Sequence, residues 1–114
     1  MTQTKVIASN FEMSSGDSKL LTITTLDQDD AVVDITGASI SMVIAKRVNT
    51  TALVTKAGTI INAVGGVFTI DLLPADTDAL SGVYYFEMQL TDASGRISTV
   101  VYGSLTIRQD AITP

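Results

Sequence analysis

The chain has 114 residues, 46% hydrophobic and 17% charged, with a net charge of −5 and neither cysteine nor histidine. Its length fits one domain, residues 1–114, with one hydrophobic core. The absence of cysteine excludes disulfides, thiol nucleophiles and thiolate metal sites, and the seven scattered basic residues form no stripe that could bind nucleic acid.

The N-terminal stretch MTQTKVIASNF has one lysine and a short apolar patch, Val6 to Ala8. A signal-peptide core needs about 7–15 apolar residues and a membrane span about 20. We therefore expect no contact with a membrane and a chain that is made and stays in the cytoplasm. Residues 1–10 are expected to form an N-terminal arm beside the domain.

Apolar and polar residues alternate with a period of two in most of the remaining sequence, which is typical of strands. Strands are predicted within residues 18–26, 38–46 and 67–72. Residues 52–55 and 59–61 are predicted to form a short strand pair. Pro74, followed by acidic residues, favours one helical turn within 74–80. The side chains expected to face inward are Leu21, Ile23, Ile40, Met42, Ile44, Phe68, Ile70 and Leu72.

The strongest alternation lies in residues 80–96, LSGVYYFEMQLTDASGR. Tyr84, Phe86, Met88 and Leu90 are expected to face inward, and Tyr85 to face outward. Asp92 to Gly95 reads as a hairpin loop.

The last strand, residues 96–108, is expected to hold Ile97, Thr99, Val101, Leu105 and Ile107 on its inner face, with a bulge or bend at Gly103. Val100 and Tyr102 would then lie outward beside Tyr85 on the preceding strand. These three residues are the candidate contact patch, a surface for a protein or a sugar. The alternative is that a loop, a short strand or the N-terminal arm covers them.

Seven or eight short strands separated by turn residues favour an all-β fold, an immunoglobulin-like antiparallel β-sandwich. The Cys…Trp…Cys pattern of antibody domains is missing, so only the architecture is inferred. Residues 109–114, QDAITP, are expected to form a C-terminal tail, which like the arm could dock on a neighbouring molecule.

Catalytic and ligand-binding patterns are weak. Ser14, Ser15 and Ser18 beside Lys19 could in principle form a Ser-Lys dyad, but short Ser/Gly/Asp clusters are usually turns. Asp27 to Asp30 fits an Asx turn better than a calcium loop, and Gly65-Gly66 fits hairpin glycines better than a phosphate loop. We assign no catalytic residue, cofactor or metal ligand, and we expect neither an enzyme nor a small-molecule ligand.

Four features in order carry a family resemblance that covers most of residues 11–108. They are Gly16-Asp17, Val33-Asp34-Ile35-Thr36-Gly37-Ala38, Gly66-Val67-Phe68-Thr69-Ile70 with Pro74 to Leu80, and Gly82-Val83-Tyr84…Thr91-Asp92…Gly95…Gly103-Ser104-Leu105-Thr106-Ile107. The pattern resembles small immunoglobulin-like proteins of tailed bacteriophage tails, baseplates and necks, including the N-terminal domains of baseplate upper proteins.

This resemblance implies a non-enzymatic structural protein of the virion, made in the host cytoplasm. Its partners would be other virion proteins and further copies of itself, and it brings no catalytic residues. The alternative from another class is a receptor- or carbohydrate-binding β-sandwich module.

Overall fold

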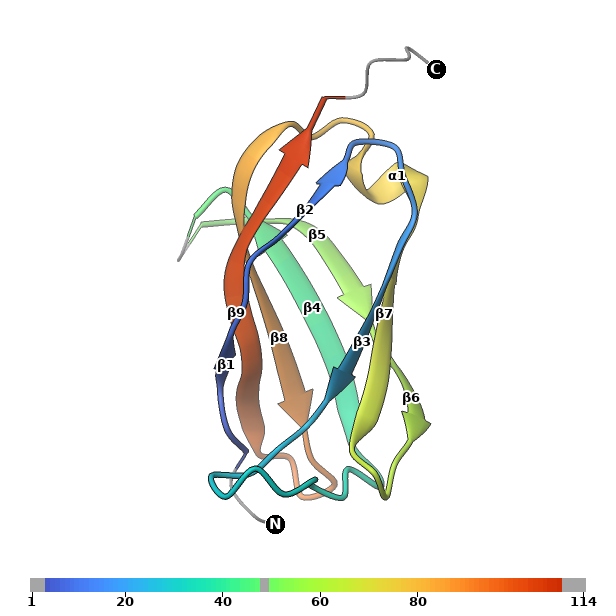
Figure 1. The fold of residues 1–114 in the computed structure, drawn as a ribbon, viewed down its shortest axis with the longest axis vertical. Coiled ribbons are helices and arrows are strands. Elements are labelled where there is room, and N and C mark those ends of the chain that lie inside the picture. The colour runs from blue at the N-terminus through green and yellow to red at the C-terminus, as the bar shows by residue number, and fades with distance from the viewer. Residues whose placement is uncertain (1–3, 48–49, 110–114) are drawn as a thin grey trace.

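The computed structural model describes residues 4–47 and 50–109 (Figure 1). Strands dominate these residues because β-branched and alternating segments lie between turn residues. The elements are β1 (Ile7–Ala8), β2 (Phe11–Ser14), β3 (Lys19–Thr24), β4 (Ser39–Ala45), β5 (Ala52–Ala57), β6 (Thr59–Asn62), β7 (Val67–Leu72), α1 (Pro74–Thr77), β8 (Gly82–Thr91) and β9 (Ile97–Arg108).

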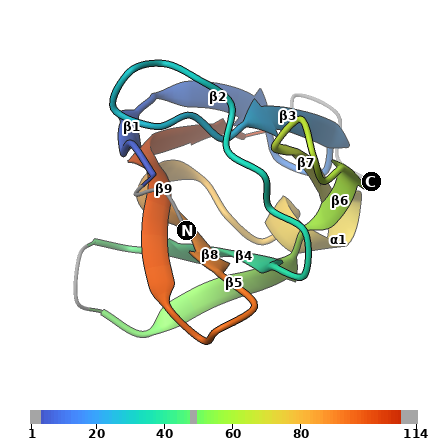
Figure 2. The same cartoon turned by 90° about the horizontal axis from the view of Figure 1, so that it is seen from below.

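The strands form two sheets that face each other, as the view from below shows (Figure 2). One sheet has the order β1-β9-β8-β4-β5, with β2 also pairing with β9, and the other has the order β3-β7-β6. If β3 to β9 are read as strands B, C, C′, D, E, F and G, these sheets are the G-F-C-C′ and B-E-D sheets of an immunoglobulin domain. The predicted immunoglobulin-like β-sandwich is confirmed.

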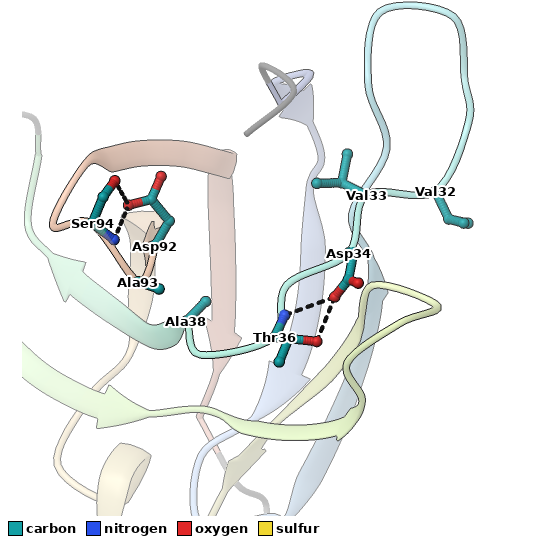
Figure 3. Close-up of a pocket in the computed structure, with 8 residues that line it drawn as sticks. All are labelled: Val32, Val33, Asp34, Thr36, Ala38, Asp92, Ala93 and Ser94. Atoms are coloured by element: carbon teal, nitrogen blue, oxygen red, sulfur yellow. Dashed lines mark hydrogen bonds between the residues drawn. The ribbon is translucent and has the colours of Figure 1, made fainter.

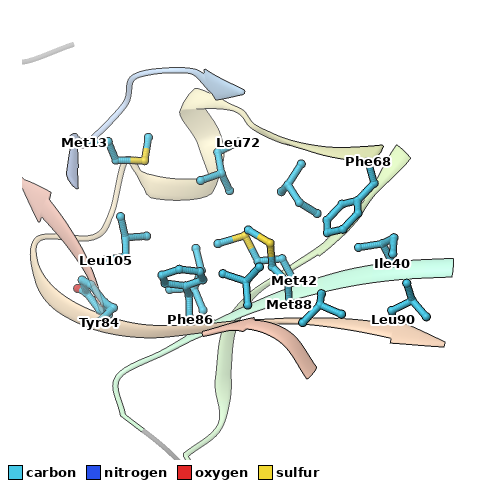
Figure 4. Packing of buried hydrophobic residues seen from close by; sticks show 14 of the residues in the cluster. Met13, Ile40, Met42, Phe68, Leu72, Tyr84, Phe86, Met88, Leu90 and Leu105 are labelled. Atoms are coloured by element: carbon cyan, nitrogen blue, oxygen red, sulfur yellow. The ribbon is translucent and has the colours of Figure 1, made fainter. Parts of the chain in front are cut away.

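The core lies between the sheets, where side chains from the two layers point toward one another (Figure 4). Phe68 of β7 and Phe86 of β8 are almost fully buried, and Phe11 meets Phe86 edge-on with ring centroids 5.0 Å apart. Burying one such side chain contributes about 1.5–3 kcal/mol, so this cluster is the main source of stability. The predicted inward residues of β4, β7 and β8 are all buried: Ile40, Met42, Ile44, Phe68, Ile70, Leu72, Tyr84, Phe86, Met88 and Leu90.

The predicted pairing of residues 52–55 with 59–61 is wrong. Both segments are strands, but β5 pairs with β4 in one sheet and β6 pairs with β7 in the other. The chain passes between the sheets at Gly58, whose amide donates to the carbonyl of Ile40 at 2.8 Å. A Cβ on Gly58 would lie 2.8 Å from the Cβ of Ile40, so this close passage requires glycine.

The N-terminal arm is part of the larger sheet in the described residues, and this raises the strand count to nine. Within the predicted arm 1–10, β1 pairs with β9 in parallel, and β2 continues that parallel pairing beyond it (Figure 1). Thr4 forms a bridge with Asp27. Residues 1–3, and 110–114 of the predicted tail, lie outside the described residues.

The inward face of β9 also differs from the prediction. Its register with β8 shifts between Met88 and Gln89, which makes Val100 an extra residue in a β-bulge. Val100 and Val101 are both buried, at 2% and 3% exposure, whereas Ile97 is 65% exposed. The extra residue of a bulge reverses the alternation between inward and outward side chains on one side of it. The predicted inner and outer faces of β9 are therefore wrong for every residue before the bulge.

Gly103 does not mark this bulge. A Cβ there would lie 1.5 Å from the carbonyl oxygen of Ser9. Glycine is therefore needed because the arm runs directly over β9 at this point.

Candidate contact surface and loop pocket

The outward faces of β8 and β9 carry a cluster that we call the tyrosine patch: Tyr85, Glu87, Gln89 and Tyr102. Glu87 lies in register with Val43 of β4 on one side and with Tyr102 of β9 on the other. Tyr102 is 41% exposed and Tyr85 is partly buried. Two of the three predicted contact residues therefore lie on one outward sheet face.

The side chains of β8 in this patch are hydrogen-bonded to each other. The hydroxyl of Tyr85 donates to Oε2 of Glu87 at 2.7 Å, and Nε2 of Gln89 donates to Oε1 of Glu87 at 2.7 Å. Alternate residues of a strand lie on the same face. The spacing of Tyr85, Glu87 and Gln89 in the sequence could therefore have placed Glu87 and Gln89 beside Tyr85 on the outward face. The carboxylate holds both neighbours in place.

The Tyr85 hydroxyl is a hydrogen-bond donor to Glu87. Burial and the hydrogen bond to the Glu87 carboxylate raise the pKa of Tyr85 to about 12 from its ordinary 10.0. Both effects disfavour the phenolate, the first by desolvation and the second by repulsion between negative charges. Tyr85 therefore stays neutral at physiological pH.

Val100, the third predicted contact residue, is not part of the patch. The bulge turns its side chain into the core, where it is 2% exposed. Its role is to fill space between the sheets.

Tyr84 and Tyr85 have separate roles, as the alternation predicted. Tyr84 is 6% exposed, and its hydroxyl donates to the carbonyl of Ser81 at 2.9 Å and accepts from the Ser81 amide at 3.1 Å. A tyrosine near the start of strand F that bonds back to the preceding backbone resembles the tyrosine corner of immunoglobulin-like folds. Tyr84 thus anchors the entry to β8.

A second candidate site, not predicted from the sequence, is a pocket of about 530 Å³ at one end of the sandwich (Figure 3). It lies between the β3–β4 connection and the β8–β9 hairpin, which correspond to the B–C and F–G loops of an immunoglobulin domain. The lining residues are Val32, Val33, Asp34, Thr36, Ala38, Asp92, Ala93 and Ser94.

Each wall of the pocket contains an aspartate two residues before a hydroxyl residue. Oδ1 of Asp34 accepts from the amide and the hydroxyl of Thr36. Oδ1 of Asp92 accepts from the amide and the hydroxyl of Ser94, and also from the amide of Arg96 at 2.9 Å. These are Asx turns, for which D-x-[ST] was a readable signal in the sequence.

These hydrogen bonds favour the ionised form of both carboxyl groups. The Thr36 hydroxyl lowers the pKa of Asp34, and the Ser94 hydroxyl, with the Arg96 amide, lowers the pKa of Asp92. The pocket therefore presents negative charge from both walls. Such a lining suits a cationic group or sugar hydroxyls better than an anion.

The close approach of the two pocket loops involves Gly37. Its φ is +80°, and a Cβ there would lie 3.1 Å from the Cβ of Ala93. A larger residue at position 37 would strain the turn and push the β8–β9 hairpin away.

The weaker sequence patterns have structural roles where the structure describes them. Oδ1 of Asp27 accepts from the amides of Asp29 and Ala31, which confirms the Asx turn. Gly66, at φ +72°, lies in the hairpin between β6 and β7, as predicted. Lys19 lies over the ring of Phe11 at 5.9 Å. Within residues 4–47 and 50–109, no group of three or more acidic side chains could hold a metal ion.

The two sheets and the loop arrangement define an immunoglobulin-like β-sandwich. Neither a protein-family model nor a curated protein matches the sequence. Among solved structures, CopC from Methylosinus trichosporium OB3b is similar at a TM-score of 0.51 and 12% identity, covering 90% of this chain and 87% of that one. At that identity the likeness shows the fold alone.

Two further structures show weaker likeness. A fibronectin(III)-like module of Clostridium thermocellum CbhA has a TM-score of 0.46 and 12% identity, covering 96% of this chain and 98% of that one. AggA, the major subunit of aggregative adherence fimbriae type I from Escherichia coli, has a TM-score of 0.37 and 13% identity, covering 92% of this chain and 91% of that one.

The helix in the described part of this chain is too short to cross a membrane.

Proposed function

We propose that this chain is a non-enzymatic module that works through protein–protein contacts, with the tyrosine patch as a contact surface. The observation that carries this proposal is the hydrogen-bonded row Tyr85–Glu87–Gln89 beside the exposed ring of Tyr102. Tyrosine is enriched in protein interfaces because it offers a large apolar area and a polar tip.

The row is held in its binding conformation before any partner arrives. Tyr85 and Gln89 are both tied to Glu87, so little side-chain entropy remains to be lost on binding. Neighbouring positions in register are the uncharged Val43 and Ser104. Glu87 is the one charged side chain of the patch, and both of its carboxylate oxygens already accept hydrogen bonds there, which lowers the cost of desolvating it.

The particular setting we propose is the virion of a tailed bacteriophage, in the tail, the baseplate or the neck. The support is the resemblance in the order of turn glycines and alternating strands described above. In such a particle the chain would contact other virion proteins and further copies of itself.

This function can be tested on phage particles assembled in host cells that carry the gene with an epitope tag. We expect immunogold label on the tail, baseplate or neck of wild-type particles. Tyr102→Ala should reduce labelling strongly, because truncating a central interface aromatic costs about 2 kcal/mol or more, roughly thirtyfold in affinity. Val64→Ala, at a residue 70% exposed in the turn before β7, is the matched control. Unlabelled particles would contradict the proposal.

The loop pocket favours the second candidate, a receptor- or carbohydrate-binding module. Its two ionised carboxylates could accept hydrogen bonds from sugar hydroxyls, and the loop end of immunoglobulin-like domains is a common binding region. A glycan array, run with and without calcium, tests this function. Val32→Trp enlarges one lining side chain and should weaken any binding, whereas Val83→Trp, on β8 outside the pocket lining, should not.

A further inference from the structure

Strand β3 lies at one edge of the smaller sheet, and only one of its sides is paired along its length. Lys19 to Thr24 pair with β7. On the other side, the described residues provide a backbone partner only past the end of the strand, where the Lys5 amide donates to the carbonyl of Leu26 at 2.8 Å. The arm then leaves toward β9, beginning the parallel pairing at Ile7.

The backbone groups that face away from β7 can be identified from the register. The Thr25 amide donates to the carbonyl of Gly66 at 2.7 Å, so position 25 points toward β7. Bonding direction alternates along an antiparallel strand, so the amides and carbonyls of Leu20, Thr22 and Thr24 point away from the sheet. The side chains of these three residues are exposed as well.

The other edges of the described sheets are interrupted, and the edge formed by the arm is broken between the end of β1 at Ala8 and the start of β2 at Phe11. The register of β5 with β4 shifts at Ala45, and Lys56 of β5 pairs with Asp76 at 3.0 Å. The register of β6 with β7 shifts between Ile60 and Asn62. Bulges and charged side chains are the usual means by which natural sheets prevent edge pairing. In β3 the register runs through six residues without a shift.

We propose that the β3 edge is a dimerisation site that pairs, antiparallel, with β3 of a second copy of this chain. The two-fold axis would pass by Thr22, so that Thr22 faces its own counterpart and Leu20 faces Thr24 of the second copy. All outward backbone groups of β3 would then be paired, forming up to about six hydrogen bonds. The two smaller sheets would become one continuous sheet.

A second copy fits this edge in its side chains as well. Leu21 and Ile23 face the core but stay only partly buried. In the proposed register Leu21 lies beside Ile23 of the second copy, so each would cover the other's exposed part. Lys19 is the one charged residue of β3, and it would lie opposite the uncharged Thr25, so no like charges face each other across the paired strands.

This site deepens the proposed function, because it needs a chain that assembles with itself, but it uses a surface separate from the tyrosine patch. The patch lies on β8 and β9 of the larger sheet, and β3 lies in the smaller one. Substitutions in one surface should leave the other intact, so the two proposals can fail independently.

Thr22→Pro is the decisive variant. Proline removes the outward amide hydrogen of Thr22, which bonds no other described residue, and keeps every hydrogen bond to β7. We expect light scattering of the wild-type chain to show a dimer whose dissociation constant rises at least about tenfold in Thr22→Pro, since two bonds at the axis are lost. Thr22→Val keeps the amide and should dimerise like wild type. Circular dichroism and the thermal midpoint check that both variants fold.

Hydrogen exchange of the same samples gives a second readout. The amides of Leu20, Thr22 and Thr24 should exchange rapidly in dilute solution and at least tenfold more slowly when the dimer is populated. The proposal is overturned by a wild-type chain that stays monomeric at high concentration, or by folded Thr22→Pro that dimerises like wild type. Loss of the dimer in Tyr102→Ala alone would also overturn it and would assign self-association to the tyrosine patch.

Discussion

Replacing Gly103 by alanine should push the N-terminal arm away from β9 at the point where the two cross. The new Cβ would lie 1.5 Å from the carbonyl oxygen of Ser9 and 2.6 Å from its carbonyl carbon, far inside any real contact distance. Gly103 needs no left-handed backbone conformation, so the residue can accept a side chain. The strain therefore comes from the arm, and the arm must move.

The cost can be worked out from the contacts at this crossing. The Ser9 amide donates to the carbonyl of Tyr102 at 2.9 Å, and Oδ1 of Asn10 accepts from the Ser104 amide at 3.0 Å. Losing both hydrogen bonds costs about 1 kcal/mol each. The lower entropy of the unfolded alanine chain returns about 0.4–1 kcal/mol. We expect Gly103→Ala to lower the free energy of unfolding by about 1–2 kcal/mol, which is roughly 5–10 °C in thermal midpoint for a domain of this size.

Urea unfolding followed by circular dichroism measures this change, and a chain that begins at residue 11 supplies the control. Without residues 1–10 the clash partner is absent, so the substitution should become neutral or slightly stabilising. An equal cost in the full-length and shortened chains would refute the reasoning, because the clash would then lie elsewhere.

Three further predictions concern the core, the bulge and the pocket loop. Tyr84→Phe should lower the free energy of unfolding by about 1–2 kcal/mol in urea titrations, because the hydroxyl loses its two bonds to Ser81. Val100→Ala should cost about 2 kcal/mol and Ile97→Ala less than about 0.5, since only Val100 is buried; the reverse order would contradict the bulge. The lowered pKa of Asp92 means that its contribution is present above its ordinary value of 3.8 and is lost as pH falls through the folded-state pKa, so Asp92→Asn should flatten the acid side of the stability profile.

The strand pattern was readable from the sequence because side chains in a strand alternate between two faces. Period two placed the inward side chains of β4, β7 and β8 correctly, and it separated the buried Tyr84 from the outward Tyr85. The turn at Asp27 and the helical turn at Pro74 were also readable, because short-range hydrogen bonding and a fixed φ act within a few residues. These features depend on the local sequence alone.

Features that depend on residues far apart in the chain were decided by the tertiary structure. The bulge at Val100 is defined by the register between β9 and β8, and a single extra residue reverses the faces before it. The same holds for the separation of β5 from β6, which follows from the partners each strand finds in a different sheet.

The candidate sites also combine features set by the local sequence with features set by contacts between residues far apart in the chain. The outward position of Tyr85 followed from alternation, but its bond to Glu87 and its register beside Tyr102 required the paired sheet. The pocket required two loops more than fifty residues apart to meet, at Asp34 and Asp92. Alternation specifies which face a side chain takes, whereas strand pairing and loop packing specify its neighbours, and only neighbours make a site.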